Sequence, residues 1–152
     1  MGQPAVAHAE HRFTQVVVRP ALRAPRGIRR LWALQESRLA DMASGALPGG
    51  CFFSNAQFEF TMRPGSVRDA LSAALADWHT LLERLIREAT ELGELRADVH
   101  PAQLAFELNA LGTAAVYESR LLRADEIYTY ARTAALQRLR GLALVPYLED
   151  LP

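Results

Sequence analysis

Residues 66–92 read SVRDALSAALADWHTLLERLIREATEL, and the apolar side chains in this run recur at spacings of three and four. That spacing is the 3.6-residue period of one buried stripe on an α-helix. Ser66 is expected to be the N-cap, with Asp69 three residues on as a capping-box-like carboxylate. Gly93 suits the other end, because glycine readily adopts the left-handed conformation that ends many helices. The run therefore predicts one long amphipathic helix.

Proline and glycine divide the rest of the 152-residue chain into five further helices. Alanine, leucine, arginine and glutamate dominate, and all are strong helix formers. The alternating pattern of β-branched residues that marks strands is nearly absent. We therefore expect an all-α fold, a single domain built as an antiparallel bundle of about six helices. The expected helices cover about 5–22, 26–43, 51–62, 66–92, 101–122 and 125–144, with a tail at 145–152 and residues 1–12 left open as either helix or tail.

Composition excludes several classes of function. Seventeen arginines balance seventeen acidic residues and there is no lysine, so the chain lacks the positive field of most free-standing nucleic-acid binders. A single cysteine excludes a disulfide framework and a cysteine-based zinc cluster. No apolar run approaches the roughly 20 residues that a membrane span needs, and no secretion signal is visible. We expect a cytoplasmic protein that makes no membrane contact.

Two features are candidates for reactive chemistry. His8 and His11 lie three residues apart, as a metal-binding pair on one helix face would, but no third ligand is nearby and an exposed pair is the favoured interpretation. Cys51 would lie at a helix N-terminus, which lowers a thiol pKa, but no base stands close in sequence and a buried cysteine is favoured. No nucleophile and base pair, phosphate loop or paired-carboxylate motif is present. We therefore predict no catalytic residues, no metal and no cofactor.

Aromatic residues are concentrated in the short helix expected at 51–62. Four phenylalanines there provide more apolar surface than one buried stripe needs. Either the helix is buried on most sides, or part of it lines a cavity for an apolar ligand, and the two alternatives weigh about equally. The residues of this cluster are Phe52, Phe53, Phe58 and Phe60, joined by Trp78.

Three segments resemble parts of a known family. Residues 48–53 read PGGCFF, residues 63–69 read RPGSVRD, and residues 93–101 read GELRADVHP. Together they resemble the C-terminal effector-binding and dimerisation domain of TetR-family transcriptional regulators. The segment 13–22 and the turn at 25–27 are similar to the helix and turn that follow the DNA-binding head in that family. The resemblance covers nearly the whole chain.

The resemblance implies a homodimer that senses a small molecule. The helices expected at 101–122 and 125–144 would pair with their copies across a two-fold axis. In an intact regulator, a ligand that prefers one arrangement of the bundle changes affinity for operator DNA. This chain has no residues for the helix-turn-helix head that enters the major groove, so we expect it not to bind DNA on its own. The small residues suited to the dimer interface are Ala110, Gly112, Ala114, Ala115, Ala131, Ala134 and Ala135.

The effector pocket would be enclosed by the second to fifth helices. Its residues are predicted from their amphipathic positions, with Gln57 and Asn109 as polar anchors in a mostly apolar lining. Two alternatives stay open: a purely structural helical dimer without a ligand, and a small helical enzyme that uses Cys51 or the two histidines. The predicted lining is Trp32, Phe53, Gln57, Phe60, Trp78, Leu82, Leu108, Asn109 and Tyr117.

Overall fold

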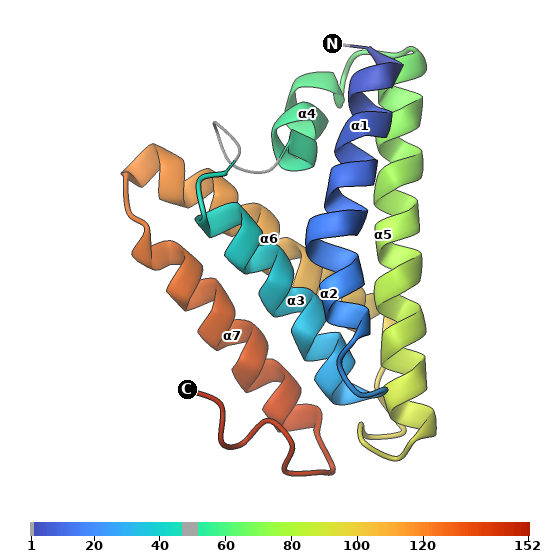
Figure 1. Cartoon of the computed structure of the whole chain (residues 1–152), viewed down its shortest axis with the longest axis vertical. Helices are drawn as coiled ribbons and strands as arrows, with labels where there is room; N and C mark the ends of the chain where they lie inside the picture. The colour runs from blue at the N-terminus through green and yellow to red at the C-terminus, as the bar shows by residue number, and fades with distance from the viewer. Residues whose placement is uncertain (1, 47–51) are drawn as a thin grey trace.

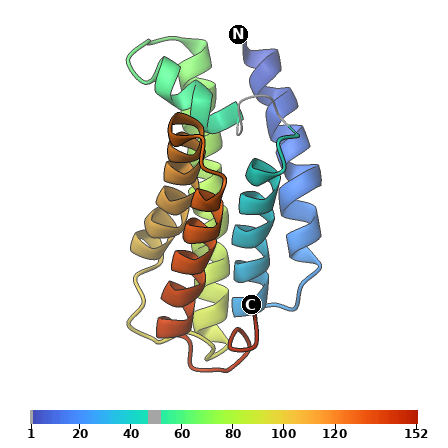
Figure 2. The same ribbon diagram turned by 90° about the vertical axis from the view of Figure 1, so that its left-hand side faces the viewer.

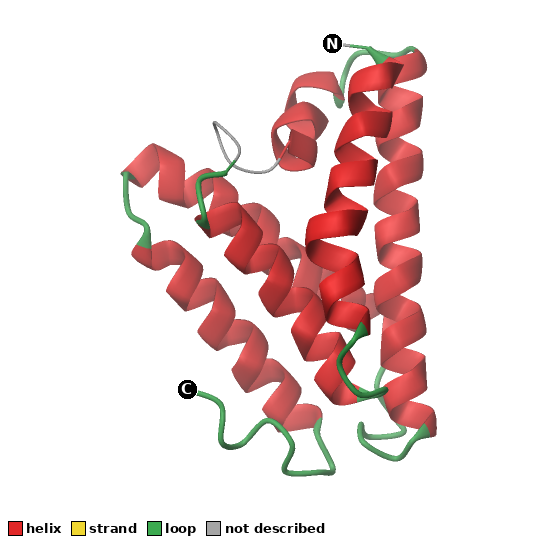
Figure 3. Cartoon of the chain, viewed as in Figure 1, coloured by secondary structure: helices red, strands yellow, loops and turns green. Residues whose placement is uncertain are grey.

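A computed structural model describes residues 2–46 and 52–152, and within these ranges helix is the only regular structure apart from one isolated β-bridge (Figures 1 and 3). The first three elements join into one continuous helix, so the predicted all-α fold with about six helices is confirmed. Cys51 and the glycine turn before it lie outside the described residues. The elements are α1 (Gln3–Phe13), the π-helical segment η1 (Thr14–Val18), α2 (Arg19–Leu22), α3 (Ile28–Ala43), α4 (Phe52–Phe60), α5 (Ser66–Glu91), α6 (Pro101–Leu122) and α7 (Glu126–Leu142).

The long helices pack in two groups that share a core. The continuous helix α1–η1–α2 lies along α5, while α3 packs antiparallel to α7 (Figures 1 and 2). Helix α6 crosses behind them and contacts both α5 and α7. The short helix α4 lies beside α5 near the end of the molecule where α1 begins. Along its length α5 therefore contacts four other helices, namely α1, α3, α4 and α6.

The long helix α5 supplies one wall of the core, as its periodicity predicts. Its buried residues include Trp78, Leu82 and Leu85, which join the largest hydrophobic cluster. Ser66, however, is the first helical residue and makes no capping bond, because Gly65 occupies the N-cap position with φ +138°. The predicted serine cap is therefore wrong.

The first helix continues through Pro20 and ends at Leu22, as the expected range of 5–22 predicts. Proline has no N–H to donate to the carbonyl four residues back and its ring crowds that carbonyl. The preceding turn widens into η1, in which the Arg19 N–H bonds the carbonyl of Thr14 five residues back. The Val16 carbonyl instead accepts a bond from Ser37 Oγ of α3 at 3.5 Å. A π-helical turn thus absorbs the proline without breaking the helix.

The start of α3 is capped by a side chain from a distant loop. Glu94, between α5 and α6, is 8% exposed, and its Oε2 accepts a bond from the Ile28 N–H at 2.7 Å. The residue before Ile28 is Gly27, with φ +102°, and a Cβ there would lie 1.7 Å from the same carboxylate oxygen. Only glycine therefore fits between the cap and the helix that it caps.

Both ends of the chain are held in place. Arg12 forms a two-pronged ion pair with Asp41, at 3.0 and 2.9 Å, and this contact ties α1 to α3. Helix α7 ends at Leu142, two residues earlier than predicted, because the chain turns to pair with the α5–α6 loop. In the segment predicted as a tail, Leu148 is 2% exposed and its carbonyl accepts bonds from Arg140.

Candidate functional site

A cavity of about 240 Å³ lies where α1, α3, α4, α5 and α6 meet. Most of its surface is apolar, and polar groups lie at its mouth and on its deep side. Glu10, Thr14 and Asp77 are exposed at the mouth, between α1 and α5. The lining residues are Glu10, Phe13, Thr14, Val18, Arg38, Phe53, Ser54, Gln57, Ala74, Leu75, Asp77, Trp78, Leu81 and Asn109.

Three aromatic rings from three helices form one wall of this cavity. The Phe13 ring meets the Trp78 ring edge to face at 5.2 Å between centroids, and the Phe53 ring at 6.0 Å. Such perpendicular contacts stabilise aromatic pairs beyond the area that they bury. The cavity wall is therefore held rigidly by packing between α1, α4 and α5.

Polar groups on the deep side are held by hydrogen bonds. Trp78 Nε1 donates to Asn109 Oδ1 at 3.1 Å, and Arg38 Nη1 donates to the Asn109 backbone carbonyl at 3.3 Å. The Arg38 guanidinium also lies 5.3 Å from the centre of a Trp78 ring, within cation–π range. Arg38 is only 5% exposed, so this cavity contains a buried positive charge.

The structure brings four of the predicted pocket residues together in this cavity: Phe53, Gln57, Trp78 and Asn109. Trp32, Leu82 and Leu108 are instead 4%, 0% and 0% exposed and pack in the main core. Their helices each have a wide apolar face, and amphipathic position alone does not separate core residues from cavity residues.

Phe60 and Tyr117 lie elsewhere. Phe60 lines a second hollow of about 330 Å³, which shares Gln57 and Leu75 with the main cavity. Tyr117 is exposed on α6, with its ring 4.0 Å from that of Phe58. Neither residue lines the main cavity.

Arg38 is the cavity residue that sequence reasoning missed. A signal for it exists, because Arg38 falls on the same stripe of α3 as Leu31, Leu34 and Met42, all buried. A charged residue on a buried stripe is uncommon and is usually paired or functional. The four phenylalanines of α4 predicted an apolar cavity wall, whereas the charged residue of the cavity belongs to α3.

Small residues predicted at a dimer interface divide into two sets. Four of them are buried within their own chain, where their small size lets α3, α6 and α7 approach closely. These four are Gly112, Ala115, Ala131 and Ala135. Ala110 and Ala134 are half-buried and Ala114 is exposed, so these three stay available for an interface.

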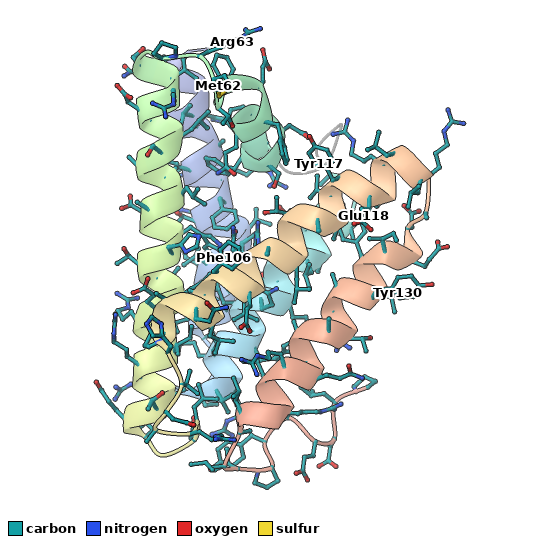
Figure 4. The ribbon with its side chains drawn as sticks, turned by 180° about the vertical axis from the view of Figure 1, so that it is seen from behind. Met62, Arg63, Phe106, Tyr117, Glu118 and Tyr130 are labelled. Carbon is teal, nitrogen blue, oxygen red and sulfur yellow. The ribbon has the colours of Figure 1, made fainter. Side chains whose placement is uncertain are left out.

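The outer face of α6 and α7 carries large apolar side chains (Figure 4). Phe106 is 61% exposed on α6 and Tyr130 is 62% exposed on α7. Between these helices Arg138 Nε donates to Glu107 Oε2 at 2.7 Å, which lowers the pKa of the Glu107 carboxyl below its usual value. We call this surface the α6–α7 face; its exposed apolar residues are Phe106, Tyr117, Leu121, Leu122 and Tyr130.

The candidate reactive groups do not assemble into a site within the described ranges. His8 and His11 are both exposed on α1, away from any cluster. Among the residues that the structure describes, no three His, Cys, Asp or Glu side chains are grouped as a metal site would require. In the same ranges no helix is both long and apolar enough to cross a membrane.

The amino-acid sequence matches the model of one protein family and is similar to a known transcriptional regulator. Residues 27–135 match the family model described as "Tetracyclin repressor-like, C-terminal domain". The transcriptional regulator AcuR of Cereibacter sphaeroides is 33% identical over 100 residues, which cover 64% of this chain and 46% of AcuR. The match thus spans about half the length of that relative.

Two solved structures share the fold. A TetR transcriptional regulator from Chloroflexus aurantiacus J-10-FL superposes with a TM-score of 0.84 at 19% identity, over 91% of this chain and 70% of that one. A TetR-family regulator from Cytophaga hutchinsonii superposes with a TM-score of 0.76 at 17% identity, over 93% of this chain and 70% of that one. At these identities the likeness concerns the fold alone.

Proposed function

Because this chain belongs to the family of tetracyclin repressor-like C-terminal domains, we propose that it is the ligand-sensing and dimerising part of a TetR-type transcriptional regulator. The observation that carries the proposal is the cavity of about 240 Å³ enclosed by five helices. A concave, mostly apolar site with a few convergent polar groups is what small-molecule recognition requires.

The cavity is placed to couple its occupant to the rest of the bundle. Glu10, Phe13, Thr14 and Val18 of the first helix form one wall, and Asn109 of α6 forms another. A ligand that prefers one spacing of these walls shifts the bundle toward that spacing. In a regulator that carries a DNA-binding head, the first helix would transmit that shift to the head.

Ligand binding is tested by a thermal-shift screen of small molecules against the chain and a variant with a filled cavity. Ala74 lines the cavity, so Ala74→Phe should abolish every shift that depends on the cavity. Ala73 is exposed one position away on the same helix, so Ala73→Phe is the matched control and should leave the shifts intact. Shifts that persist unchanged in Ala74→Phe would contradict binding in this cavity.

Dimerisation is proposed to use the α6–α7 face. An exposed apolar surface on two neighbouring helices is typical of an interface between subunits, and Ala110, Ala114 and Ala134 would allow close approach there. Light scattering should give the mass of a dimer for the unaltered chain and of a monomer for Phe106→Glu. Leu92→Glu replaces an exposed leucine at the end of α5 and should remain dimeric. A monomeric unaltered chain would refute this part of the proposal.

A further inference from the structure

We propose that the ligand of the main cavity is a small apolar carboxylic acid, bound as its carboxylate, and that Arg38 is the residue that selects it. The inference rests on the proposed ligand-sensing function and adds the chemical class of the ligand. It starts from one unusual feature, a guanidinium that lines the cavity while its residue is 5% exposed.

Contacts from two other helices, α5 and α6, fix the position of that guanidinium. Asn109 of α6 accepts a bond from Nη1 at 3.3 Å, and Trp78 of α5 lies against the cation at 5.3 Å. A Cβ at position 112 would lie 2.4 Å from Arg38 Nη1, so Gly112 leaves the space that the guanidinium fills. Arg38 is thus held in a defined place at the cavity wall, as a residue that recognises a ligand must be.

The placement of charges in the cavity, with Arg38 buried and the two acids exposed, favours an anion at its deep end. Burial weakens the screening of the Arg38 charge, so its attraction for a carboxylate is stronger there than at the surface. Guanidinium also matches the planar geometry of a carboxylate, which it can bind through two parallel hydrogen bonds. The acidic residues Glu10 and Asp77 are exposed at the mouth, where water and salt screen their repulsion of an anion.

The remaining walls define the body of the ligand. Phe13, Phe53, Leu75 and Leu81 offer an apolar surface with no charge to match a second ionic group. A cavity of 150 Å³ holds benzene, so 240 Å³ is room for a ligand of about ten non-hydrogen atoms. The predicted class is therefore a monocarboxylate with one small aromatic or branched aliphatic group.

The test compares three probes of nearly equal size and shape. Phenylacetate, phenylacetamide and phenethylamine share one ring and differ in charge, and each has about ten non-hydrogen atoms. Affinities for the unaltered chain are measured by isothermal titration calorimetry at one salt concentration. We expect phenylacetate to bind at least about tenfold more tightly than either of the other two, because a hydrogen bond to a charged partner contributes more than a neutral one.

Variants of Arg38 then connect the preference to this residue. Arg38→Met should reduce the affinity for phenylacetate to that for phenylacetamide, and Arg38→Lys, which keeps the charge but not the fork, should give an intermediate value. Arg68→Met is the matched control, because Arg68 lines only the second hollow. Far-UV circular dichroism checks that each variant is folded, and the comparison of the three probes needs no variant at all.

Three results would overturn the inference. The first is equal or tighter binding of the amide or the amine, and the second is an Arg38→Met chain that still prefers the carboxylate. Either would leave the sensing function standing if the thermal-shift screen finds ligands that Ala74→Phe excludes. Absence of binding by phenylacetate and by other carboxylates of its size also overturns the inference, whereas only an empty screen counts against ligand sensing itself.

Discussion

Removal of the carboxylate that caps α3 tests how the helical bundle is assembled. Glu94→Ala deletes the 2.7 Å bond to the Ile28 N–H and leaves that donor buried, since Ile28 is 0% exposed. A hydrogen bond to a charged group contributes about 1.5–3 kcal/mol, and an unsatisfied buried donor adds a desolvation cost. We therefore expect Glu94→Ala to lower the free energy of unfolding by about 2–3 kcal/mol.

Gly27→Ala disturbs the same contact from the other side. The new Cβ would lie 1.7 Å from Glu94 Oε2, so the carboxylate must leave the helix end. The backbone at φ +102° adds about 1–3 kcal/mol of strain for a residue with a side chain. Together these costs come to about 3–5 kcal/mol, of which about 2 is the lost cap.

The double variant Gly27→Ala/Glu94→Ala separates the two costs. Because the cap can be lost only once, the double variant should be about as unstable as Gly27→Ala alone. The assay is urea unfolding followed by circular dichroism at one protein concentration, since the proposed dimerisation would make stability concentration-dependent. Glu91→Ala removes an exposed acid near the same end of α5 and should cost less than about 0.5 kcal/mol.

Additive costs in the double variant would refute the capping interpretation. So would a Glu94→Ala chain that is as stable as the Glu91→Ala control. In either case the burial of Glu94 would need a reason other than the start of α3.

Three further predictions concern the cavity, the α6–α7 face and the C-terminal segment. Gly112→Ala should push the Arg38 guanidinium from its place and weaken phenylacetate binding by about tenfold in calorimetry; unchanged affinity would show that glycine is not needed there. Glu107→Gln should lower the melting temperature at pH 7 but not at about pH 3, by an amount that corresponds to at most about 1 kcal/mol for this partly exposed pair. Arg138 lowers the pKa of the Glu107 carboxyl in the folded state, so the ion pair stabilises the fold above the ordinary pKa of Glu107 and this stabilisation is lost as the pH falls through the folded-state pKa. An equal decrease in melting temperature at both pH values would contradict the ion pair as the cause. Leu148→Ala should lower the free energy of unfolding by about 2–5 kcal/mol in urea, whereas a cost below about 0.5 kcal/mol would mean that this segment is not part of the core.

The helical fold could be predicted from the sequence because each helix depends on residues close together in the chain. The spacing of apolar residues along α5 and the proline at the start of α6 each act within a few residues. Where a distant contact intervenes, local reasoning fails. No local pattern predicted the π-helical turn η1, in which Ser37 bonds the carbonyl that Pro20 leaves free, and α7 ends early because its last residues pair with the loop after α5.

The predicted cavity residues were right where local spacing was enough and wrong where helix packing decided. Four of the nine predicted residues line it, since aromatic and amide residues on the inner sides of α4, α5 and α6 are recognisable from their spacing. Leu82 and Leu108 have the same spacing, and only the packing of five helices decides which inward residues touch one another and which border empty space.

The amino-acid sequence alone predicts a bundle of helices with an apolar interior, because helix periodicity depends on residues that are neighbours in the chain. Three further features follow from how the helices pack: Arg38 faces the cavity, Gly112 makes room for it, and Glu94 caps a helix 66 residues away in the chain. Each of these depends on the distance between atoms far apart in sequence. No local pattern encodes that distance, because it is the result of how all the helices pack together.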